Sequence, residues 1–562
     1  ACKRLPCLES AGIHTVINGP ITYTPDGVPL VGRLPGRQNA WCITGLRAGL
    51  GEGGGHGWLL AQMIAHGEAC YDTWALDPRR FGSWANQDYT ALKAIEDYQN
   101  EFRFHRPHEH RPAGRPARTT PLTPVLEAAG AAFGVVNGWE RALFFKPSPD
   151  FTDQHEFGFT PTKDVVAAEV ACVRDRVGIM EVNGFNRIEI AGEGAAEWLA
   201  RLIAGRIPTR VGKVGLCYAL TDQGNVAIEA TLARLGEDRF WWGSAAAAED
   251  HDWDWLEAQR PEGVTLTRLT ESHTILVLAG PGSRALLTEL APRGGWDDFP
   301  WLSLREVRIG QWPVMAMSVS FSGELAWELH IPNHALLGVY HMLVAAGEAH
   351  GLGHFGLYAT ESMRIEKGYR HWKADLITEF DPYESGLDRF VKLDHMFPGR
   401  SALEGRYGND PSQLIQQEPR ELPDQAETPS GERALAGASE AGVSSMHSGA
   451  ASGTCSIGVL PGSAVAVGPQ RGKRRAFVTL EVFTDTAPAH PGDSLYRDGR
   501  VVGTVTSAAW GHRVGKNLAM GFVEPDLSAE TTEFSIELLG QTYPARVVAP
   551  CLYDPKNERL RA

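Results

Sequence analysis

The chain has 562 residues, of which 43% are hydrophobic and 22% charged, as in an ordinary soluble globular protein of roughly three to four domains. Its formal net charge of −15 argues against non-specific binding to nucleic acid or acidic membranes, because both need a basic face. The cysteines form no zinc-type cluster, and apolar runs fall short of the ~18 residues of a membrane span. We therefore expect no metal, nucleic-acid or membrane partner, and a reducing compartment, either the bacterial cytoplasm or the mitochondrial matrix.

The N-terminal region reads like the end of a domain in a processed, split or truncated chain, because it starts at Ala1 and soon becomes β-rich. Residues 13–44 alternate short β-rich runs with turns, and glycines cluster over 45–57 before a helical pattern at 58–64. Clustered glycines let backbone N–H groups approach a flat or anionic ligand at the start of a helix, although a tight loop is the commoner outcome. A polar, Arg/His/Pro-rich passage then predicts a connector over 101–160.

The central region, residues 161–406, is predicted to form an α+β domain. Its helical patterns alternate with β-rich runs without the regular rhythm of a doubly wound parallel sheet. The expected helices are 195–203 and 336–349, and the expected strands are 187–190, 274–279 and 314–321.

The C-terminal region changes composition twice. Over residues 407–470, Pro, Gln, Glu, Ser, Gly and Ala dominate, which predicts a disordered insertion because such a segment buries too little apolar surface to offset chain entropy. Residues 471–562 then carry β-rich runs separated by turn residues, which predicts a small β-barrel domain. The sequence contains no HExxH or Walker-type motif, so zinc-protease and NTPase functions lack support.

Four segments have patterns more specific than composition. They are PITYTPDGVPLVG with GLRAGLGEGGGHG (20–32 and 45–57), the strand-turn-strand run 218–232, the run SFSGELAWEL (320–329), and the run 359–390. Together these segments resemble the dimethylglycine and sarcosine dehydrogenase family. In that family a D-amino-acid-oxidase-like flavin amine dehydrogenase is fused to a folate-binding module of the glycine-cleavage T-protein type.

The resemblance makes residues 1–100 the C-terminal remnant of an FAD-dependent oxidoreductase domain. In the family this segment lies over the flavin, so Gly49, Leu50 and Gly51 would approach the isoalloxazine ring. No GxGxxG strand-turn-helix precedes residue 13, and the covalent flavin histidine belongs to that missing part. We therefore expect FAD to bind tightly only when another segment or a partner chain supplies the Rossmann half.

The run 218–232 implies the catalytic residue. In the family an acid follows the glycine turn by about five positions, and Glu229 stands there. Its carboxylate would face the folate amine nitrogens, where it can stabilise positive charge and accept a proton as the one-carbon bridge closes. Tyr218, at the start of the run, is a further candidate folate contact. A lone glutamate on the solvent face of a strand is the alternative.

The run 320–329 resembles the family hairpin whose later glutamate binds the pterin, which implies Glu328 as a folate ligand. A carboxylate suits that position because it can accept paired N–H bonds from the amino-pyrimidinone edge. A hairpin with two exposed acids is the alternative.

The run 359–390 matches the family almost without gaps and adds two candidate folate contacts, Arg364 and Phe390. A buried ion pair explains Arg364 equally well, and core packing is the default for Phe390. Thr360 stands where glycine-cleavage T-proteins have a folate-contacting arginine, so that contact is not carried over.

The resemblance implies oxidative N-demethylation of dimethylglycine or sarcosine, with transfer of the one-carbon unit to tetrahydrofolate to give 5,10-methylenetetrahydrofolate. This chain would carry mainly the folate half. Two alternatives stay open: a flavin-independent folate-dependent demethylase or aminomethyltransferase, and a non-catalytic regulatory homologue. The flavoprotein remnant argues against the first, and the presence of Glu229 and Glu328 argues against the second.

Overall fold

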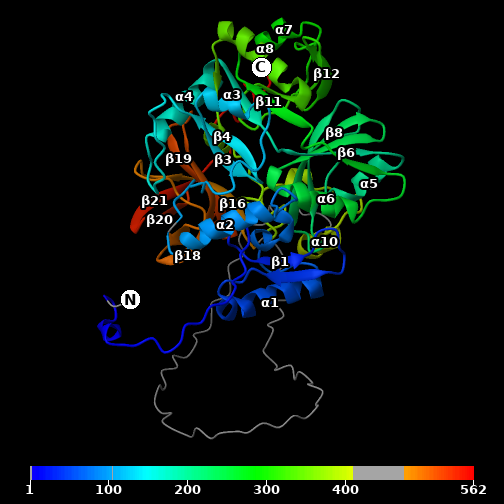
Figure 1. Cartoon of the computed structure of the whole chain (residues 1–562). Helices are drawn as coiled ribbons and strands as arrows, with labels where there is room; N and C mark the ends of the chain where they lie inside the picture. Colours follow the sequence, from blue (N-terminus) through cyan, green and yellow to red (C-terminus); the bar gives the residue numbers. More distant parts are fainter. Residues whose placement is uncertain (1–2, 104, 409–473) are drawn as a thin grey trace. The chain divides into compact units, whose positions relative to one another are not determined.

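The computed structural model describes residues 3–103, 105–408 and 474–562 (Figure 1). The described residues up to Glu404 and from 474 onward belong to one compact unit. The predicted disordered insertion, 407–470, lies almost entirely outside the described residues. Within the described ranges no helix is long and apolar enough to cross a membrane.

The N-terminal segment contains a two-stranded antiparallel sheet and two longer helices. Strands β1 (Leu30–Arg33) and β2 (Trp41–Thr44) pair, and helices α1 (Gly49–His66) and α2 (Gln87–Gln99) follow. The helix predicted from residue 58 therefore begins nine residues earlier and contains the clustered glycines. Each glycine makes a helix about 1 kcal/mol less favourable than alanine does, but helical dihedral angles remain open to it. The helix formed by the apolar residues after Gly57 can therefore extend toward the N-terminus through the glycine-rich stretch.

The central region is built on two sheets, which confirms the predicted α+β class. The first has the order β10-β6-β9-β8-β7, with strands β6 (Asn186–Ala191), β7 (Val214–Leu220), β8 (Val226–Gly236), β9 (Arg239–Ser244) and β10 (Thr265–Arg268). Helix α5 (Ala195–Leu202) packs on it through Ala195, Leu199 and Leu202, whose spacing puts them on one helical face. Helix α6 (Glu249–Glu257) follows β9.

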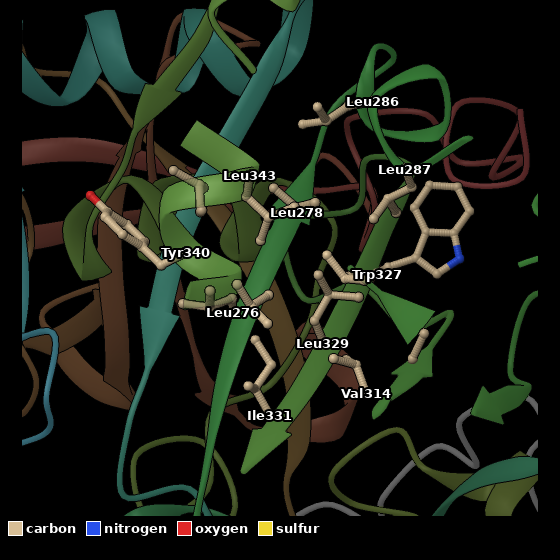
Figure 2. Close-up of a cluster of buried hydrophobic side chains, with 14 of the residues drawn as sticks. Leu276, Leu278, Leu286, Leu287, Val314, Trp327, Leu329, Ile331, Tyr340 and Leu343 are labelled. Atoms are coloured by element: carbon tan, nitrogen blue, oxygen red, sulfur yellow. The ribbon is translucent and has the colours of Figure 1, made fainter. Parts of the chain in front are cut away.

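The second sheet has the order β12-β13-β14-β11-β5-β15. Its strands are β5 (Val177–Val182), β11 (His273–Ala279), β12 (Leu304–Ile309), β13 (Trp312–Met317), β14 (Ala326–Pro332) and β15 (Leu352–His354). Helices α7 (Ser283–Leu290) and α8 (Asn333–Gly347) contribute to its core. Figure 2 shows Trp327, Leu329 and Ile331 of β14 within this core. The strand predicted over 314–321 ends at Met317.

The predicted connector, 101–160, contains regular structure that packs on this second core. Helix α3 (Thr123–Ala128) is followed by the hairpin of β3 (Ala131–Val136) and β4 (Trp139–Phe145), and Ala131 and Ala142 join the core cluster of the six-stranded sheet. The prediction of a connector rested on the Arg/His/Pro-rich first half of the passage and missed the apolar second half, which forms this helix and hairpin. Helices α4 (Thr162–Asp175), α9 (Leu357–Glu366) and α10 (Arg400–Tyr407) complete the region.

The C-terminal region is a closed six-stranded barrel, as predicted (orange to red in Figure 1). Its strands are β16 (Ala476–Val482), β17 (Ser494–Arg497), β18 (Arg500–Gly511), β19 (Lys516–Val523), β20 (Glu533–Leu538) and β21 (Gln541–Val548), in the order β16-β19-β18-β17-β20-β21. Alternate residues such as Val478, Leu480 and Val482 fill the interior, as the period of a strand requires.

Candidate functional site

The structure brings together three of the predicted site residues, Glu229, Tyr218 and Phe390. Tyr218 of β7 and Glu229 of β8 are direct cross-strand partners, and the Tyr218 hydroxyl donates a hydrogen bond of 2.9 Å to Glu229 Oε2. The Tyr218 ring, only 2% exposed, meets Phe390 edge to face with 5.1 Å between ring centroids. Directly opposed residues share a face of the sheet, so the strand register places the phenol against the carboxylate.

The electrostatics of Glu229 suit proton transfer. Burial raises the pKa of Glu229 to about 7, against the opposing effects of the Tyr218 hydrogen bond and the nearby Arg370 charge. Arg370 donates from Nε to the Ser385 carbonyl at 2.9 Å and from Nη1 to the Gly368 carbonyl at 3.1 Å, so it is held close by the backbone. A carboxyl group that titrates near neutrality can both accept and return a proton at working pH. Sequence reasoning missed Arg370, although it lies in the recognised run 359–390.

Replacing Tyr218 with phenylalanine should move the titration of Glu229 above pH 7. The Tyr218 hydroxyl stabilises the charged form, so its removal raises the pKa of Glu229 further. The midpoint can be followed as a carboxyl infrared band that is absent from Glu229→Gln protein. An unmoved midpoint would contradict this assignment, and Tyr496→Phe in the barrel serves as the control.

Glu328 lies on the opposite face of β14 from the hydrophobic core. Its neighbours Trp327 and Leu329 are both fully buried in that core, and side chains alternate along a strand, so Glu328 and His330 point to the other face. There Glu328 Oε2 lies 3.2 Å from His330 Nε2. Burial raises the pKa of Glu328 to about 7, and the Arg187 charge from β6 lowers it. Among the described residues, the contact with His330 Nε2 is the one contact of hydrogen-bonding length made by the Glu328 carboxylate.

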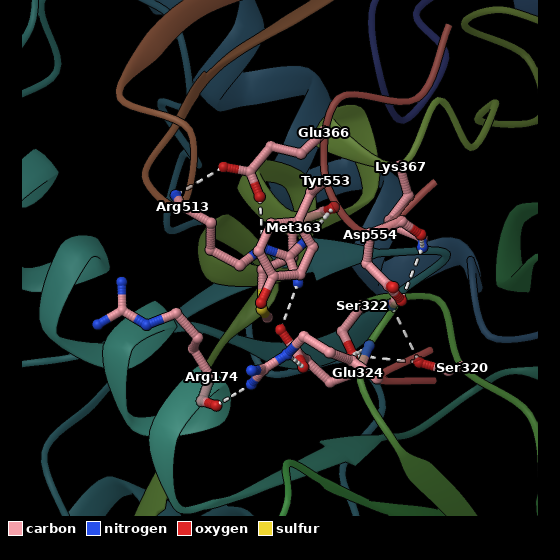
Figure 3. Close-up of polar contacts among 12 residues, drawn as sticks. Arg174, Ser320, Ser322, Glu324, Met363, Glu366, Lys367, Arg513, Tyr553 and Asp554 are labelled. Atoms are coloured by element: carbon pink, nitrogen blue, oxygen red, sulfur yellow. Dashed lines mark hydrogen bonds and ion pairs between the residues drawn. The ribbon is translucent and has the colours of Figure 1, made fainter. Parts of the chain in front are cut away.

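Glu324, the first acid of the predicted hairpin, belongs to a different site. It precedes β14, is 1% exposed, and accepts hydrogen bonds of 2.8 Å from Arg513 Nη1 and from Arg559 Nε (Figure 3). Arg513 also pairs with Glu366 of α9. Glu324 therefore connects the six-stranded sheet to the barrel and to the C-terminal segment. Glu324 and Glu328 stand four residues apart in the same predicted hairpin, but their side chains have different neighbours.

The guanidinium nitrogens of Arg364 contact other groups of the chain. Its Nη1 donates to Asp375 Oδ2 at 2.9 Å and to the Tyr369 carbonyl at 3.1 Å, and its Nε donates to Glu361 at 2.8 Å. Asp375 in turn accepts hydrogen bonds from barrel hydroxyls. This is the buried ion pair that was the alternative for Arg364, while its role as a folate contact stays a prediction.

The predicted flavin-facing residues form the first turn of α1. Leu50 is fully exposed, and the positions where Gly49 and Gly51 would carry a Cβ are open space. The same holds for four later glycines of the helix, Gly53, Gly54, Gly55 and Gly57. α1 thus presents a bare backbone surface that a flat ring could approach. Among the described residues no group of three or more His, Cys, Asp or Glu side chains could hold a metal ion.

Three family models match the chain. They are the FAD dependent oxidoreductase central domain over 66–120, the GCVT N-terminal domain over 122–395, and the Glycine cleavage T-protein C-terminal barrel domain over 475–554. The second match begins at residue 122, where α3 and the β3–β4 hairpin join the core of the six-stranded sheet.

Relatives match over the whole chain. Mouse mitochondrial dimethylglycine dehydrogenase is 31% identical and mouse mitochondrial sarcosine dehydrogenase 28% identical, each over 100% of this chain. The chain spans 58% and 60% of their respective lengths. The fold is similar to that of the glycine cleavage system aminomethyltransferase T from Bartonella henselae, with a TM-score of 0.57 and 21% identity, over 79% of this chain and 98% of that one. The chain therefore belongs to the dimethylglycine and sarcosine dehydrogenase family, of which it carries a flavoprotein segment and both T-protein domains.

Proposed function

We propose that this chain binds tetrahydrofolate and catalyses its loading with a one-carbon unit released by oxidative N-demethylation of a methylated glycine, dimethylglycine or sarcosine. The observation that carries the proposal is the Glu229–Tyr218 pair beside Phe390, in which a carboxylate accepts the hydroxyl of a buried tyrosine and burial raises its pKa to about 7. Tetrahydrofolate supplies two amine nitrogens that take up the carbon and lose protons. Glu229 would accept a proton there and stabilise positive charge on nitrogen, and Tyr218 would orient its carboxylate.

The residues around Glu328 fit the pterin end of a folate. An amino-pyrimidinone edge presents adjacent N–H groups, which a carboxylate can accept in pairs. Glu328 is partly exposed, and within the described part of the chain only its Oε2 has a contact of hydrogen-bonding length, with His330 Nε2 at 3.2 Å. A carboxylate with so few partners on a largely buried surface costs free energy unless a ligand hydrogen-bonds to it.

The residues of α1 fit the role of a flavin cover rather than that of a flavin holder. FAD, when bound, would accept the hydride equivalent from the N-methyl group. The bare glycine face of α1 would let the isoalloxazine approach the backbone, while the pyrophosphate-binding turn would come from another segment or a partner chain.

All six described cysteines are free, which supports a reducing compartment, the bacterial cytoplasm or the mitochondrial matrix.

A tetrahydrofolate titration followed by tryptophan fluorescence tests the proposal. We expect quenching in protein that shows no flavin absorbance, since the folate site is made by this chain alone. No change in fluorescence up to near-millimolar tetrahydrofolate would contradict the proposal.

Replacing Glu328 with glutamine should weaken tetrahydrofolate binding by about 1.5–3 kcal/mol, or roughly 10- to 100-fold. The amide keeps the shape but replaces one acceptor oxygen by a donor that faces the pterin N–H groups. The same titration measures the change, with Glu197→Gln on the exposed surface of α5 as the matched control. Equal affinity in the Glu328→Gln and Glu197→Gln proteins would remove Glu328 from the folate site.

A further inference from the structure

Arg187 is a buried cation without hydrogen-bond partners for either terminal nitrogen. It lies in the middle of β6, is 2% exposed, and both Nη atoms are buried and unpaired. Its guanidinium lies over the Trp241 ring at 5.5 Å from the centroid. A buried charge that makes no hydrogen bonds destabilises a fold, so such a residue is retained for something other than stability.

Side-chain contacts connect Arg187 to the carboxylate of Glu328. The Trp241 ring beneath the guanidinium lies 5.7 Å, between centroids, from the ring of His330, and His330 Nε2 lies 3.2 Å from Glu328 Oε2. Burial lowers the pKa of Arg187 to about 10, and the Glu328 charge opposes that effect. No nitrogen–oxygen contact of 4.0 Å or less joins these two described side chains, so Arg187 acts on Glu328 through space and occupies neither carboxylate oxygen. On the neighbouring strands, the residues paired with Glu328 are uncharged, Val277 of β11 and Met317 of β13.

The histidines around Glu328 cannot replace this charge. Burial and the Arg187 charge hold the pKa of His330 well below its usual value, and the same two causes lower the pKa of His273 to about 4. Both imidazoles are therefore neutral at pH 7. Arg187 is the fixed positive charge facing Glu328 among the described residues.

We propose that Arg187 is a positioning residue for pterin recognition: held against Trp241, its guanidinium favours the ionised form of Glu328, the form whose oxygens accept the N–H groups of an amino-pyrimidinone ring. The inference rests on the proposed function. It assigns to Arg187 the ionisation of the Glu328 carboxylate before tetrahydrofolate binds. It also explains why the unpaired buried charge is kept.

The test compares Arg187→Met with Arg187→Lys and with Arg239→Met, which removes an exposed arginine from β9 of the same sheet. The first readout is the carboxyl infrared band of ligand-free protein that is absent from Glu328→Gln protein. Its midpoint should lie near pH 7 in the wild type and rise by about 1 pH unit in Arg187→Met, because an opposite charge nearby favours the ionised form. Arg187→Lys should stay closer to the wild type, and Arg239→Met should match it.

The second readout is tetrahydrofolate affinity as a function of pH. Arg187→Met should lose roughly 5-fold in affinity at pH 7, because a midpoint that rises by 1 unit from pH 7 lowers the ionised fraction of Glu328 from about one half to about one tenth, and it should recover this affinity as pH rises. A loss that is the same at every pH, or a band that does not move, would overturn the proposal. If the methionine variant does not fold, Arg187→Gln removes the same charge and is read in the same way. Wild-type protein that binds no tetrahydrofolate at any pH would instead overturn the proposed function, and with it the pterin role of Arg187.

Discussion

Replacing Arg513 with methionine should lower the free energy of unfolding by about 3–5 kcal/mol, the cost of breaking a buried ion-pair network by removing one partner. The Arg513 side chain is fully buried, donates to Glu324 at 2.8 Å and to the Met363 carbonyl at 2.6 Å, and also pairs with Glu366 (Figure 3). It stacks on Tyr553 at 3.8 Å from the ring centroid. Without it, two buried carboxylates lose the shared guanidinium that neutralises them.

Chemical denaturation of the full chain measures this loss. Arg500→Met, which removes an exposed ion pair with Glu524 on the same barrel, is the matched control and should cost no more than about 1 kcal/mol. Because Arg513 connects the barrel to α9, its loss should also separate unfolding into two transitions. A change no larger than that of the control would show that the network contributes little to the docking of the barrel.

Replacing Glu229 with glutamine should lower the rate of folate-dependent one-carbon capture by about 10²–10⁴-fold, the usual contribution of a general acid–base residue. Glutamine preserves the shape of the side chain and can still accept the Tyr218 hydroxyl, so tetrahydrofolate binding should change much less than the rate. The wild-type rate should rise with pH through about 7, since the carboxylate is the active form and burial places its pKa there.

The measurement is formation of 5,10-methylenetetrahydrofolate from tetrahydrofolate and formaldehyde, above the uncatalysed rate. Glu237→Gln, in the exposed turn after β8, is the control for a neutralised acid on the same hairpin. A Glu229→Gln rate equal to that of the control would remove the catalytic hypothesis and leave a binding or regulatory module.

Local features of the candidate site could be read from the sequence because they depend on short-range pairing. A glycine turn between β7 and β8 sets the register of the hairpin, and that register opposes Tyr218 to Glu229. The alternation of β14 likewise follows from the strand period, which separates Glu328 from the apolar residues on either side. The start of α1 could not be predicted from its glycines. Low helix propensity indicated a loop there, but the helix formed by the following apolar turns extends through these residues.

The amino-acid sequence by itself determined the α+β and barrel classes, the family, and the pair of carboxylates to test, because periodicity and local motifs carry that information. Only the tertiary structure decided which charges meet: Arg187 faces Glu328 from another sheet, Arg513 reaches Glu324 from the barrel, and both partners lie more than a hundred residues away. The reason is physical. A side chain acquires its shifted pKa and its ion-pair partner from burial and from through-space charge, and both depend on how distant segments pack rather than on their order along the chain.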